Sequence, residues 1–305
     1  MPAFTTRFAP APTGYLHLGH VVNAIWVWGL ARAHGGQVLL RLEDHDRGRC
    51  RPEYEAAILD DLDWLGFIPD GASTADFRAG AHPQRQSDNT AAYAARLEEL
   101  ERRGLAYPCD CSRADIERAI GADAGDRHRT EGTELRYPGT CRTGTSGPLP
   151  TPARRIRLEA GTIERFTDRR LGPQAQDPDL QCGDLLARDR HGNFTYQFCV
   201  VVDDLEQGVD LVIRGEDLLS STGRQIRLAR LLGRTTPPQF LHHPLIRHPD
   251  GRKLSKSAGD TGVRELRASG MSAAEVIGRA AGLAGLGHDG TPIAATELAA
   301  LLRTS

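Results

Sequence analysis

Two lysines, Lys253 and Lys256, stand three residues apart in the stretch HPDGRKLSKSAGD near the C-terminal end of the chain. They are its only lysines, so arginine supplies the other 36 of the 38 Lys and Arg residues. Arginine replaces lysine easily on a solvated surface, but not where a compact ammonium on a flexible stem must follow a phosphate group. The alternative is chance placement on an exposed loop. The pattern favours lysine-specific work on a phosphate.

Two histidines near the N-terminus indicate the same chemistry. His17 and His20 lie in APAPTGYLHLGH, on either side of Gly19 and at the expected start of a helix. Backbone N–H groups and the dipole at a helix start attract anions, and imidazoles can donate hydrogen bonds to phosphate oxygens. Alone, H-x-G-H could be an ordinary helix entry. Paired with the lysine stretch, it predicts a nucleotide α-phosphate held between two elements.

The elements that must position these residues alternate along the first hundred residues. TTRFAPAPTG predicts a strand and a turn, HLGHVVNAIWVWGLARAHGG an apolar helix ended by glycines, and QVLLRLED a buried strand. PEYEAAILDDLDWLGF and SDNTAAYAARLEELERRG have apolar residues at helical spacing. This alternation predicts an α/β fold with a Rossmann-like, doubly wound parallel sheet.

The sequence pattern changes at about residue 106, and we predict that the chain is divided into four parts. Residues 1–105 are the first half of the nucleotide-binding catalytic domain, and 106–195 are a small inserted module. The sheet is expected to resume at FTYQFCVVVDDLEQGVDLVIRGEDL, followed by the helix SSTGRQIRLARLLG, and PLIRHPDGRKLSKS predicts a strand, a turn and the lysine loop. The second catalytic half is therefore 196–258, and 259–305 is a short helical segment.

Composition is that of an ordinary globular protein, with 39% hydrophobic and 26% charged residues and a net charge of −2. There is no signal-peptide pattern and no apolar run of membrane length, so we expect a cytoplasmic protein with no membrane partner. The net charge provides no global basic field for nucleic acid, although a local arginine-rich face can coexist with it. The six cysteines do not indicate a disulfide framework.

Several of these motifs resemble those of a known protein family. HLGH and KLSKS are similar to the two signature motifs of class I aminoacyl-tRNA synthetases. RFAPAPTGYLHLGH, RLEDHDRGR and IRGEDLLSSTGRQ resemble the glutamate-specific branch, over roughly residues 4–260. The resemblance implies ATP with Mg²⁺. It places His17, Gly19, His20 and Lys256 at the ATP phosphates and ribose, and gives Lys253 a supporting role. The reaction, attack of an ionised carboxylate on the α-phosphate, needs positioning and charge neutralisation rather than a general base.

A glutamate substrate carries two carboxylates and an ammonium group, so its pocket needs arginine and an acid. Arg7 and Arg214 are suitable bidentate carboxylate clamps, and Glu43 can hold the ammonium. Tyr196 can shape the pocket and hydrogen-bond. These residues match the family's glutamate-binding positions. One position departs: the family usually has serine where this chain has Ala11, which leaves only a backbone contact there.

Three cysteines, Cys109, Cys111 and Cys141, are spaced as a candidate zinc site, and structural zinc normally takes four ligands. On chemistry alone, His128 is the default fourth ligand. Resemblance to the glutamyl-Q tRNA(Asp) synthetases, which place a tyrosine four residues before the last cysteine, implies Tyr137 instead. The remaining cysteines are expected to be unliganded: Cys50, Cys182 and Cys199.

The acceptor of the activated amino acid is predicted from length. A complete glutamyl-tRNA synthetase continues with a helical anticodon-binding region, and the 48 or so residues after the lysine loop are too few for one. We therefore expect a monomeric enzyme of the glutamyl-Q branch, which activates L-glutamate without RNA. That branch transfers glutamate to queuosine at the wobble position of tRNA(Asp). Alternatives are a truncated synthetase that charges tRNA(Glu), a small-molecule nucleotidylyltransferase, and a non-catalytic tRNA-binding paralogue.

Overall fold

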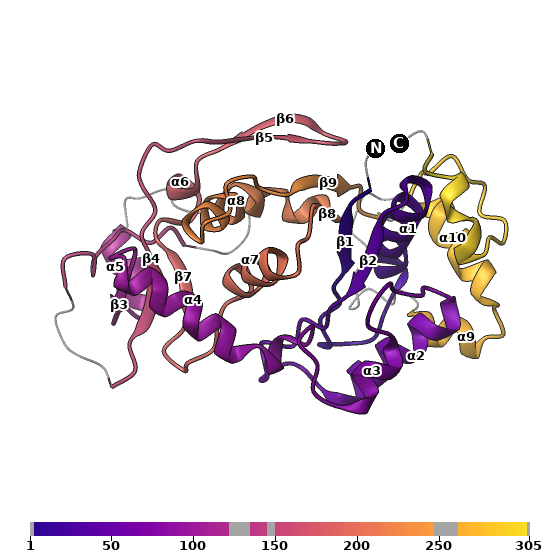
Figure 1. Cartoon of the computed structure of the whole chain (residues 1–305), viewed down its shortest axis with the longest axis horizontal. Helices are drawn as coiled ribbons and strands as arrows, with labels where there is room; N and C mark the ends of the chain where they lie inside the picture. The colour runs from indigo at the N-terminus through magenta and orange to yellow at the C-terminus, as the bar shows by residue number, and fades with distance from the viewer. Residues whose placement is uncertain (1–2, 122–134, 145–149, 247–261, 304–305) are drawn as a thin grey trace.

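The computed structural model describes residues 3–121, 135–144, 150–246 and 262–303 (Figure 1). Its strands are β1 (Thr5–Phe8), β2 (Gln37–Leu40), β3 (Ala106–Cys109), β4 (Ala153–Ile156), β5 (Glu164–Asp168), β6 (Gly172–Gln176), β7 (Leu185–Arg188), β8 (Leu211–Gly215) and β9 (Gln239–His243). Its α-helices are α1 (Leu18–His34), α2 (Pro52–Leu65), α3 (Thr74–Ala79), α4 (Thr90–Arg102), α5 (Arg113–Ile120), α6 (Pro178–Cys182), α7 (Tyr196–Glu206), α8 (Thr222–Leu231), α9 (Val263–Ala268) and α10 (Ala273–Leu283). Short 3₁₀ helices are η1 (Gln86–Asp88), η3 (Glu216–Ser221) and η5 (Ala295–Ala300).

The strands form mixed sheets, so the prediction of a doubly wound, wholly parallel sheet is only partly right. β1 pairs in parallel with β2, and β8 in parallel with β9. The Asp210 N–H donates to the Thr5 carbonyl at 2.8 Å, which sets β1 against the β8 side. β5 joins β9 in parallel and β6 in antiparallel fashion, and β3, β4 and β7 form a separate antiparallel sheet. The α/β class is confirmed, and the β3–β4–β7 sheet lies at the far end of the elongated molecule (Figure 1).

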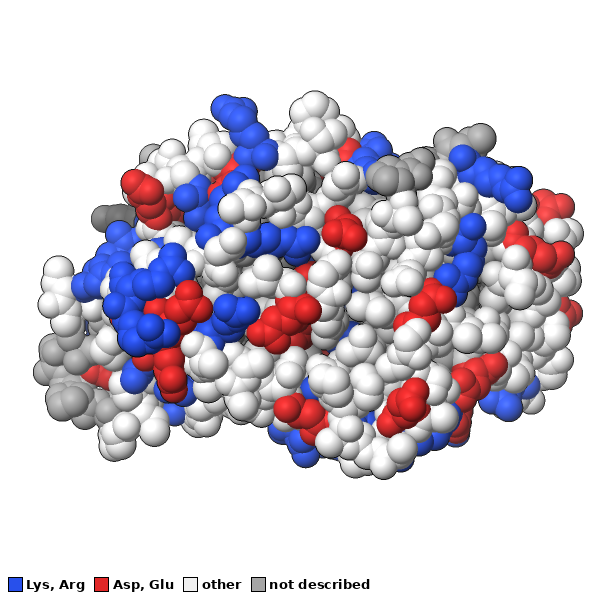
Figure 2. Space-filling model, in the orientation of Figure 1, with Lys and Arg blue, Asp and Glu red and all other residues white. Residues whose placement is uncertain are grey.

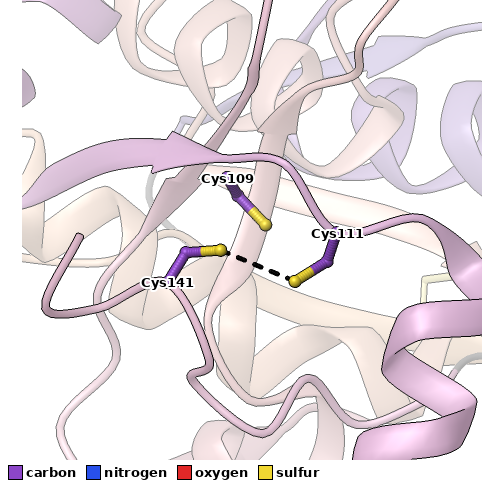
Figure 3. A group of neighbouring side chains, drawn as sticks. All are labelled: Cys109, Cys111 and Cys141. Atoms are coloured by element: carbon purple, nitrogen blue, oxygen red, sulfur yellow. Dashed lines mark hydrogen bonds between the residues drawn. The ribbon is translucent and has the colours of Figure 1, made fainter. Parts of the chain in front are cut away.

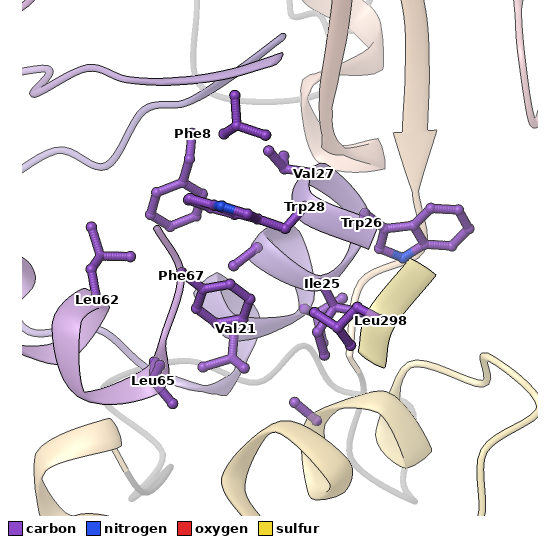
Figure 4. Close-up of a cluster of buried hydrophobic side chains, with 14 of the residues drawn as sticks. Phe8, Val21, Ile25, Trp26, Val27, Trp28, Leu62, Leu65, Phe67 and Leu298 are labelled. Carbon is purple, nitrogen blue, oxygen red and sulfur yellow. The ribbon is translucent and has the colours of Figure 1, made fainter. Parts of the chain in front are cut away.

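The first predicted helix, α1, is the centre of the main core (Figure 4). It is buried over most of its circumference, as its almost uninterrupted apolar sequence requires. The Trp28 ring lies between Phe8 and Phe67, with ring centroids 5.3 Å and 5.0 Å away. Its indole N–H donates to the Ile68 carbonyl at 2.8 Å, so its polar atom is satisfied. The strands and helices predicted for the first hundred residues are confirmed.

The described part of the C-terminal segment is helical and completes this core. Leu298 and Leu302 are fully buried against α1. A Cβ on Gly29 would lie 2.6 Å from a Leu302 methyl carbon, so the Leu302 side chain would have to shift if the glycine were replaced. Figure 1 shows α9 and α10 covering the α1 side of the molecule. The four-part division of the chain stays a prediction.

One stretch predicted as sheet is a helix. Residues Tyr196–Glu206 form α7, although Val200, Val201 and Val202 have strand propensity. Helix α7 packs against α8 and α4 within a second hydrophobic cluster, and these three valines are buried there. Tertiary burial on several sides outweighs a propensity difference of a few tenths of a kcal/mol per residue. The following stretch, Leu211–Gly215, is the expected strand.

The strand predicted at the start of PLIRHPDGRKLSKS lies earlier in the chain, at Gln239–His243. Strand β9 ends at His243, immediately before Pro244, which has no N–H to donate to a ladder. Residues 244–246 are irregular, and the rest of the stretch, with Lys253 and Lys256, lies outside the described residues. No helix among those described is both long and apolar enough to cross a membrane.

Candidate active site

Most of the predicted substrate residues line a single cavity of about 650 Å³. It opens between the start of α1, the ends of β1 and β2, and the ends of β8 and β9. Its position at the ends of parallel strands is where ligands bind in open α/β sheets. The predicted residues that it brings together are Arg7, His17, Gly19, His20, Glu43, Tyr196 and Arg214.

The two histidines are held at the start of α1 by their own side chains. His17 is the N-cap residue, and its Nδ1 accepts a hydrogen bond from the Gly19 N–H at 3.0 Å. His20 Nδ1 accepts from the His17 N–H at 3.1 Å. Because each Nδ1 is an acceptor, the proton of each neutral ring is on Nε2, from where it can be donated to a phosphate oxygen. A Cβ on Gly19 would lie 2.9 Å from the His17 ring, so glycine leaves room for the imidazole.

The chain on either side of the lysine stretch is anchored at this cavity. Ile246, the last described residue before the stretch, lines the cavity. Gly262, the first described residue after it, forms a β-bridge with His17, and the Val263 N–H donates to the Leu16 carbonyl at 3.0 Å. Lys253 and Lys256 themselves lie outside the described residues. The described residues that flank the lysine stretch on its two sides, Ile246 and Gly262, therefore lie at the cavity that His17 and His20 line.

A buried charge network fixes the acidic side of the cavity. Arg7 Nε donates to Asp204 at 3.0 Å, and the fully buried Arg41 donates to the same Asp204 oxygen at 2.7 Å. Arg41 also lies 3.9 Å from Glu43. Burial raises the pKa of Glu43 to about 7, against the opposing effect of Arg41 and Arg7. Glu43 is therefore a carboxyl group whose ionisation would be favoured by an incoming cation.

Arg214, on the other side, is a buried cation with neutral hydrogen-bond partners. Its Nε lies 3.0 Å from His242 Nε2, its Nη1 2.6 Å from Gln225 Oε1, and its Nη2 2.9 Å from Thr222 Oγ1. His242 is in turn oriented by Asp168, 2.6 Å from its Nδ1. Burial lowers the pKa of Arg214. Among the residues that the structure describes, no carboxylate forms an ion pair with Arg214, which leaves its charge to be balanced by a ligand.

Tyr196 and Ala11 differ in their relation to the cavity. Tyr196, the first residue of α7, lines it, and burial together with the nearby Glu43 raises its pKa to about 12. The neutral phenol can therefore donate or accept a hydrogen bond. Ala11 is exposed on the turn after β1 and does not line the cavity, although its carbonyl accepts from the Thr13 N–H at 2.8 Å.

Sequence reasoning missed several residues of the cavity wall. Asn23 lies one helical turn beyond His20 and donates to the Ile213 carbonyl, with its amide nitrogen 3.0 Å from His243 Nε2. The i to i+3 spacing of His20 and Asn23 is a signal that could have found it. His243 stacks on Trp26 with an interplanar angle of 9°. Nothing local in the sequence indicates that β9 delivers His243 to this wall.

The three predicted metal-binding cysteines converge beside the antiparallel sheet of β3, β4 and β7 (Figure 3). The sulfurs of Cys109, Cys111 and Cys141 all lie within 4.8 Å of one another, and Cys111 Sγ is 3.5 Å from Cys141 Sγ. Zn–S bonds of about 2.3 Å in a tetrahedron require S–S distances of about 3.8 Å, so this cluster could hold a metal ion. Tyr137 Oη lies 3.4 Å from Cys109 Sγ and 3.8 Å from Cys111 Sγ. His128 lies outside the described residues.

The other three cysteines lie apart from this cluster. Cys182 donates to the Pro178 carbonyl at 3.3 Å, and Cys199 is buried within α7. Cys50 is half-buried, and burial raises the pKa of its thiol to about 11. None of the three is in the group of candidate metal ligands found among the described residues.

Residues 3–288 match the family of class I tRNA synthetases for glutamate and glutamine (E and Q), catalytic domain. The chain belongs to this family, so it is a class I tRNA synthetase-like ligase. It is 44% identical over 262 residues to a glutamyl-Q tRNA(Asp) synthetase of Burkholderia cenocepacia, which covers 85% of this chain and 82% of the relative. A protein of the same description from Nitratidesulfovibrio vulgaris is 40% identical over 307 residues, 98% of this chain and 92% of the relative.

Solved structures agree with the family. A glutamate tRNA ligase from Elizabethkingia meningosepticum, determined in complex with its amino acid, superposes with a TM-score of 0.76 at 27% identity. The match covers 97% of this chain and 64% of that chain, so this protein spans about two thirds of the length of that ligase. The glutamate-tRNA synthetase of Elizabethkingia anophelis gives a TM-score of 0.77. The resemblance stated from the sequence motifs is confirmed.

Proposed function

We propose that this protein activates L-glutamate with ATP and transfers the glutamyl group to queuosine at the wobble position of tRNA(Asp). In the first step a glutamate carboxylate oxygen bonds to the α-phosphorus of ATP, the α–β phosphoanhydride bond breaks, and pyrophosphate leaves. In the second step a queuosine hydroxyl bonds to the glutamyl carbonyl carbon, AMP leaves, and the hydroxyl proton passes to solvent. The observation that carries the proposal is Arg214, a buried cation without a carboxylate partner among the described residues, facing the same cavity as Glu43.

The cavity's charges match those of glutamate. Arg214 and Arg7 supply positive charge for the two carboxylates, and Glu43 supplies negative charge for the ammonium group. The pKa of about 7 at Glu43 means that ammonium binding draws the carboxyl to its ionised form. Tyr196 closes the wall beside Glu43. A neutral amino acid of similar size would leave Arg214 unpaired, so the pocket selects for an acidic side chain.

The histidine side of the cavity is suited to ATP. The N-terminal turn of α1 directs its backbone N–H groups and its dipole at the space in which His17 and His20 lie. Membership of the family implies ATP and Mg²⁺, which would neutralise phosphate charge. Lys256 would contact the phosphates, with Lys253 in support. These lysine roles rest on the sequence motif and on the anchoring of the flanking residues at the cavity.

The cysteine cluster is proposed as a structural zinc site. Cys109, Cys111 and Cys141 supply three thiolates at suitable separations, and Tyr137 Oη is the oxygen that would complete the set. Zinc would join β3 to the segment that contains Tyr137 and Cys141. The metal takes no part in the activation step.

A polyanionic substrate is consistent with the surface. Both lysines lie outside the described residues, so every blue residue in Figure 2 is an arginine. On the face shown, these arginines are densest at the end of the molecule that carries α5, β3 and β4, where acidic residues also stand among them (Figure 2). A local arginine-rich face therefore exists despite the net charge of −2.

The test is a pair of assays on the purified chain. Glutamate-dependent exchange of pyrophosphate into ATP is measured without RNA, and labelled glutamate is then offered to queuosine-containing tRNA(Asp) and to tRNA(Glu). We expect exchange without RNA and transfer to tRNA(Asp) alone. Transfer to tRNA(Glu) would favour a shortened glutamyl-tRNA synthetase, whose solved relatives superpose on this chain. Absence of exchange with any amino acid would favour the non-catalytic paralogue.

A further inference from the structure

A second, smaller cavity of about 130 Å³ lies next to the glutamate site. His45 lines it, and the His45 ring centroid is 6.3 Å from that of Tyr196, which lines the larger cavity. Phe194 lines the smaller cavity only two residues before Tyr196. The short stretch at the start of α7, from Phe194 to Tyr196, thus forms part of both walls. A group in the smaller cavity would therefore lie close to an amino acid in the larger one.

The smaller cavity has the chemistry of a site for one flat polar ring. The Phe194 ring is held in place by stacking on Phe198, at 5.7 Å and 18°, and by contact with Tyr93 at 5.5 Å. Among the described residues, the Ser87 hydroxyl and the Asn193 side-chain oxygen, which belong to lining residues, have no hydrogen-bond partner. Proteins recognise unstacked RNA bases by stacking on aromatic rings and by hydrogen bonds to base edges. The volume suits a single base rather than a whole nucleotide.

One arginine lines this cavity, and two more belong to the segment just before its lining residues Gly192, Asn193 and Phe194. Arg47 lines it, the Arg188 guanidinium lies 5.9 Å from the Phe194 ring centroid, and Arg190 is exposed on the turn that follows. Within the described residues, none of these three side chains forms an ion pair or hydrogen bond. By contrast, the nearby Arg85 pairs with Glu55. Arginines without carboxylate partners in and next to the lining of a base-sized cavity are suited to backbone phosphates.

We propose that this smaller cavity receives the single unstacked base that accepts the glutamyl group, while Arg47, Arg188 and Arg190 contact the phosphates on either side of it. The inference rests on the proposed function and adds the place at which the RNA enters. It also accounts for the adjacency of the two cavities, because the acceptor hydroxyl must reach the glutamyl carbonyl carbon beside Tyr196.

The phosphate contacts are tested with Arg47→Ala and Arg190→Ala, singly and together. Exchange of pyrophosphate without RNA should stay within about twofold of wild type, because neither residue lines the larger cavity. The kcat/KM for transfer to queuosine-containing tRNA(Asp) should fall about tenfold per substitution, mainly through KM. The slope of log KM against log salt should fall by about one for each arginine removed. Arg279→Ala, an exposed arginine on α10, is the matched control and should change neither assay.

The base contact is tested separately with Ser87→Ala. Loss of one hydrogen bond should reduce transfer about fivefold to tenfold. The salt slope should stay at the wild-type value, because no phosphate contact is removed. A chain that exchanges pyrophosphate but transfers glutamate to no RNA refutes the proposed function, and this inference falls with it. A chain that transfers normally to tRNA(Asp) in all of these variants refutes this inference alone.

Discussion

The charge state of individual side chains decides what the larger cavity can bind. Glu43 has a pKa of about 7 because it is buried, and Arg214 keeps its positive charge although burial lowers its pKa. The two groups lie in one cavity with Arg7, whose Nε is already occupied by Asp204. A ligand with an ammonium group and two carboxylates satisfies all three at once. Binding of glutamate is therefore expected to depend on pH through Glu43.

The pH dependence has a definite sign. The pKa of Glu43 is raised, so the carboxyl is protonated below about pH 7 in the free enzyme and cannot pair with an ammonium group there. The KM for glutamate in pyrophosphate exchange should be flat above pH 8 and should rise about tenfold per pH unit below 7. Glu43→Gln should raise KM about 10- to 100-fold and remove this dependence. Glu98→Gln, on the exposed face of α4, should behave as wild type. A KM that does not vary between pH 6 and 8 would contradict this role.

Lys256 provides a test of the motif that lies outside the described residues. Lys256→Arg keeps the charge but replaces a compact ammonium by a planar guanidinium. We expect the kcat of pyrophosphate exchange to fall at least tenfold, with the KM for glutamate little changed. Rates are measured at saturating ATP and glutamate. Near-normal turnover would mean that the placement of the chain's only two lysines is coincidence.

Among the elements, glycines decide how closely neighbouring segments can approach. Gly183 follows α6 with a φ of +65° and forms a β-bridge with Tyr137. A Cβ at Gly183 would lie 2.0 Å from the Tyr137 carbonyl oxygen, a separation that no real structure tolerates. The Tyr137 N–H also donates to the Cys182 carbonyl at 2.8 Å. Because Gly183 has no side chain, the segment that carries Tyr137 and Cys141 can lie directly against the end of α6.

Gly183→Ala should accordingly destabilise this end of the molecule. We expect the free energy of unfolding to fall by well more than the roughly 1–2 kcal/mol that a positive φ alone costs a residue with a Cβ. Gly161→Ala, at a φ of +72° with open space around it, is the control and should show only that smaller cost. Thermal midpoints from differential scanning calorimetry distinguish the two. Equal midpoints would show that the close contact at Gly183 relaxes without cost.

The cysteine cluster makes a second prediction about elements. Purified protein should contain about one zinc per chain by elemental analysis. Cys141→Ser should lower both the zinc content and the thermal midpoint, because one thiolate ligand is lost. Cys182→Ser removes a buried thiol outside the cluster and should keep its zinc. A fully folded wild-type protein without metal would identify these cysteines as ordinary core residues.

At the scale of the whole molecule, the two proposed chemistries share one place. Strands β1, β2, β8 and β9 end at the larger cavity, and the smaller cavity lies beside it at the start of α7. The antiparallel sheet and the cysteine cluster lie toward the arginine-rich end (Figures 1 and 2). The RNA-free exchange assay separates the first chemistry from the second.

Much of this arrangement could be predicted from short stretches of sequence. The apolar pattern of α1, the His17–Gly19–His20 turn and the pair Lys253 and Lys256 predict a nucleotide phosphate site, because helix periodicity and motif chemistry are local properties. The synthetase family itself was indicated by the resemblance of the motifs, which the comparisons confirm. The cysteine spacing predicted the cluster, and the three sulfurs do converge.

Tertiary structure decided what depends on distant parts of the chain. Tyr196–Glu206 is a helix because α4 and α8 bury its valines, which a local propensity cannot anticipate. Arg7 and Asp204 are 197 positions apart in sequence, yet they form one ion pair. The pKa of Glu43 and the unbalanced charge of Arg214 likewise follow from burial and from partners on other elements. The sequence by itself determined which chemical groups are present. Only the fold determined which of them are buried from water, which form ion pairs within the protein, and which lack a charged partner and can bind a substrate.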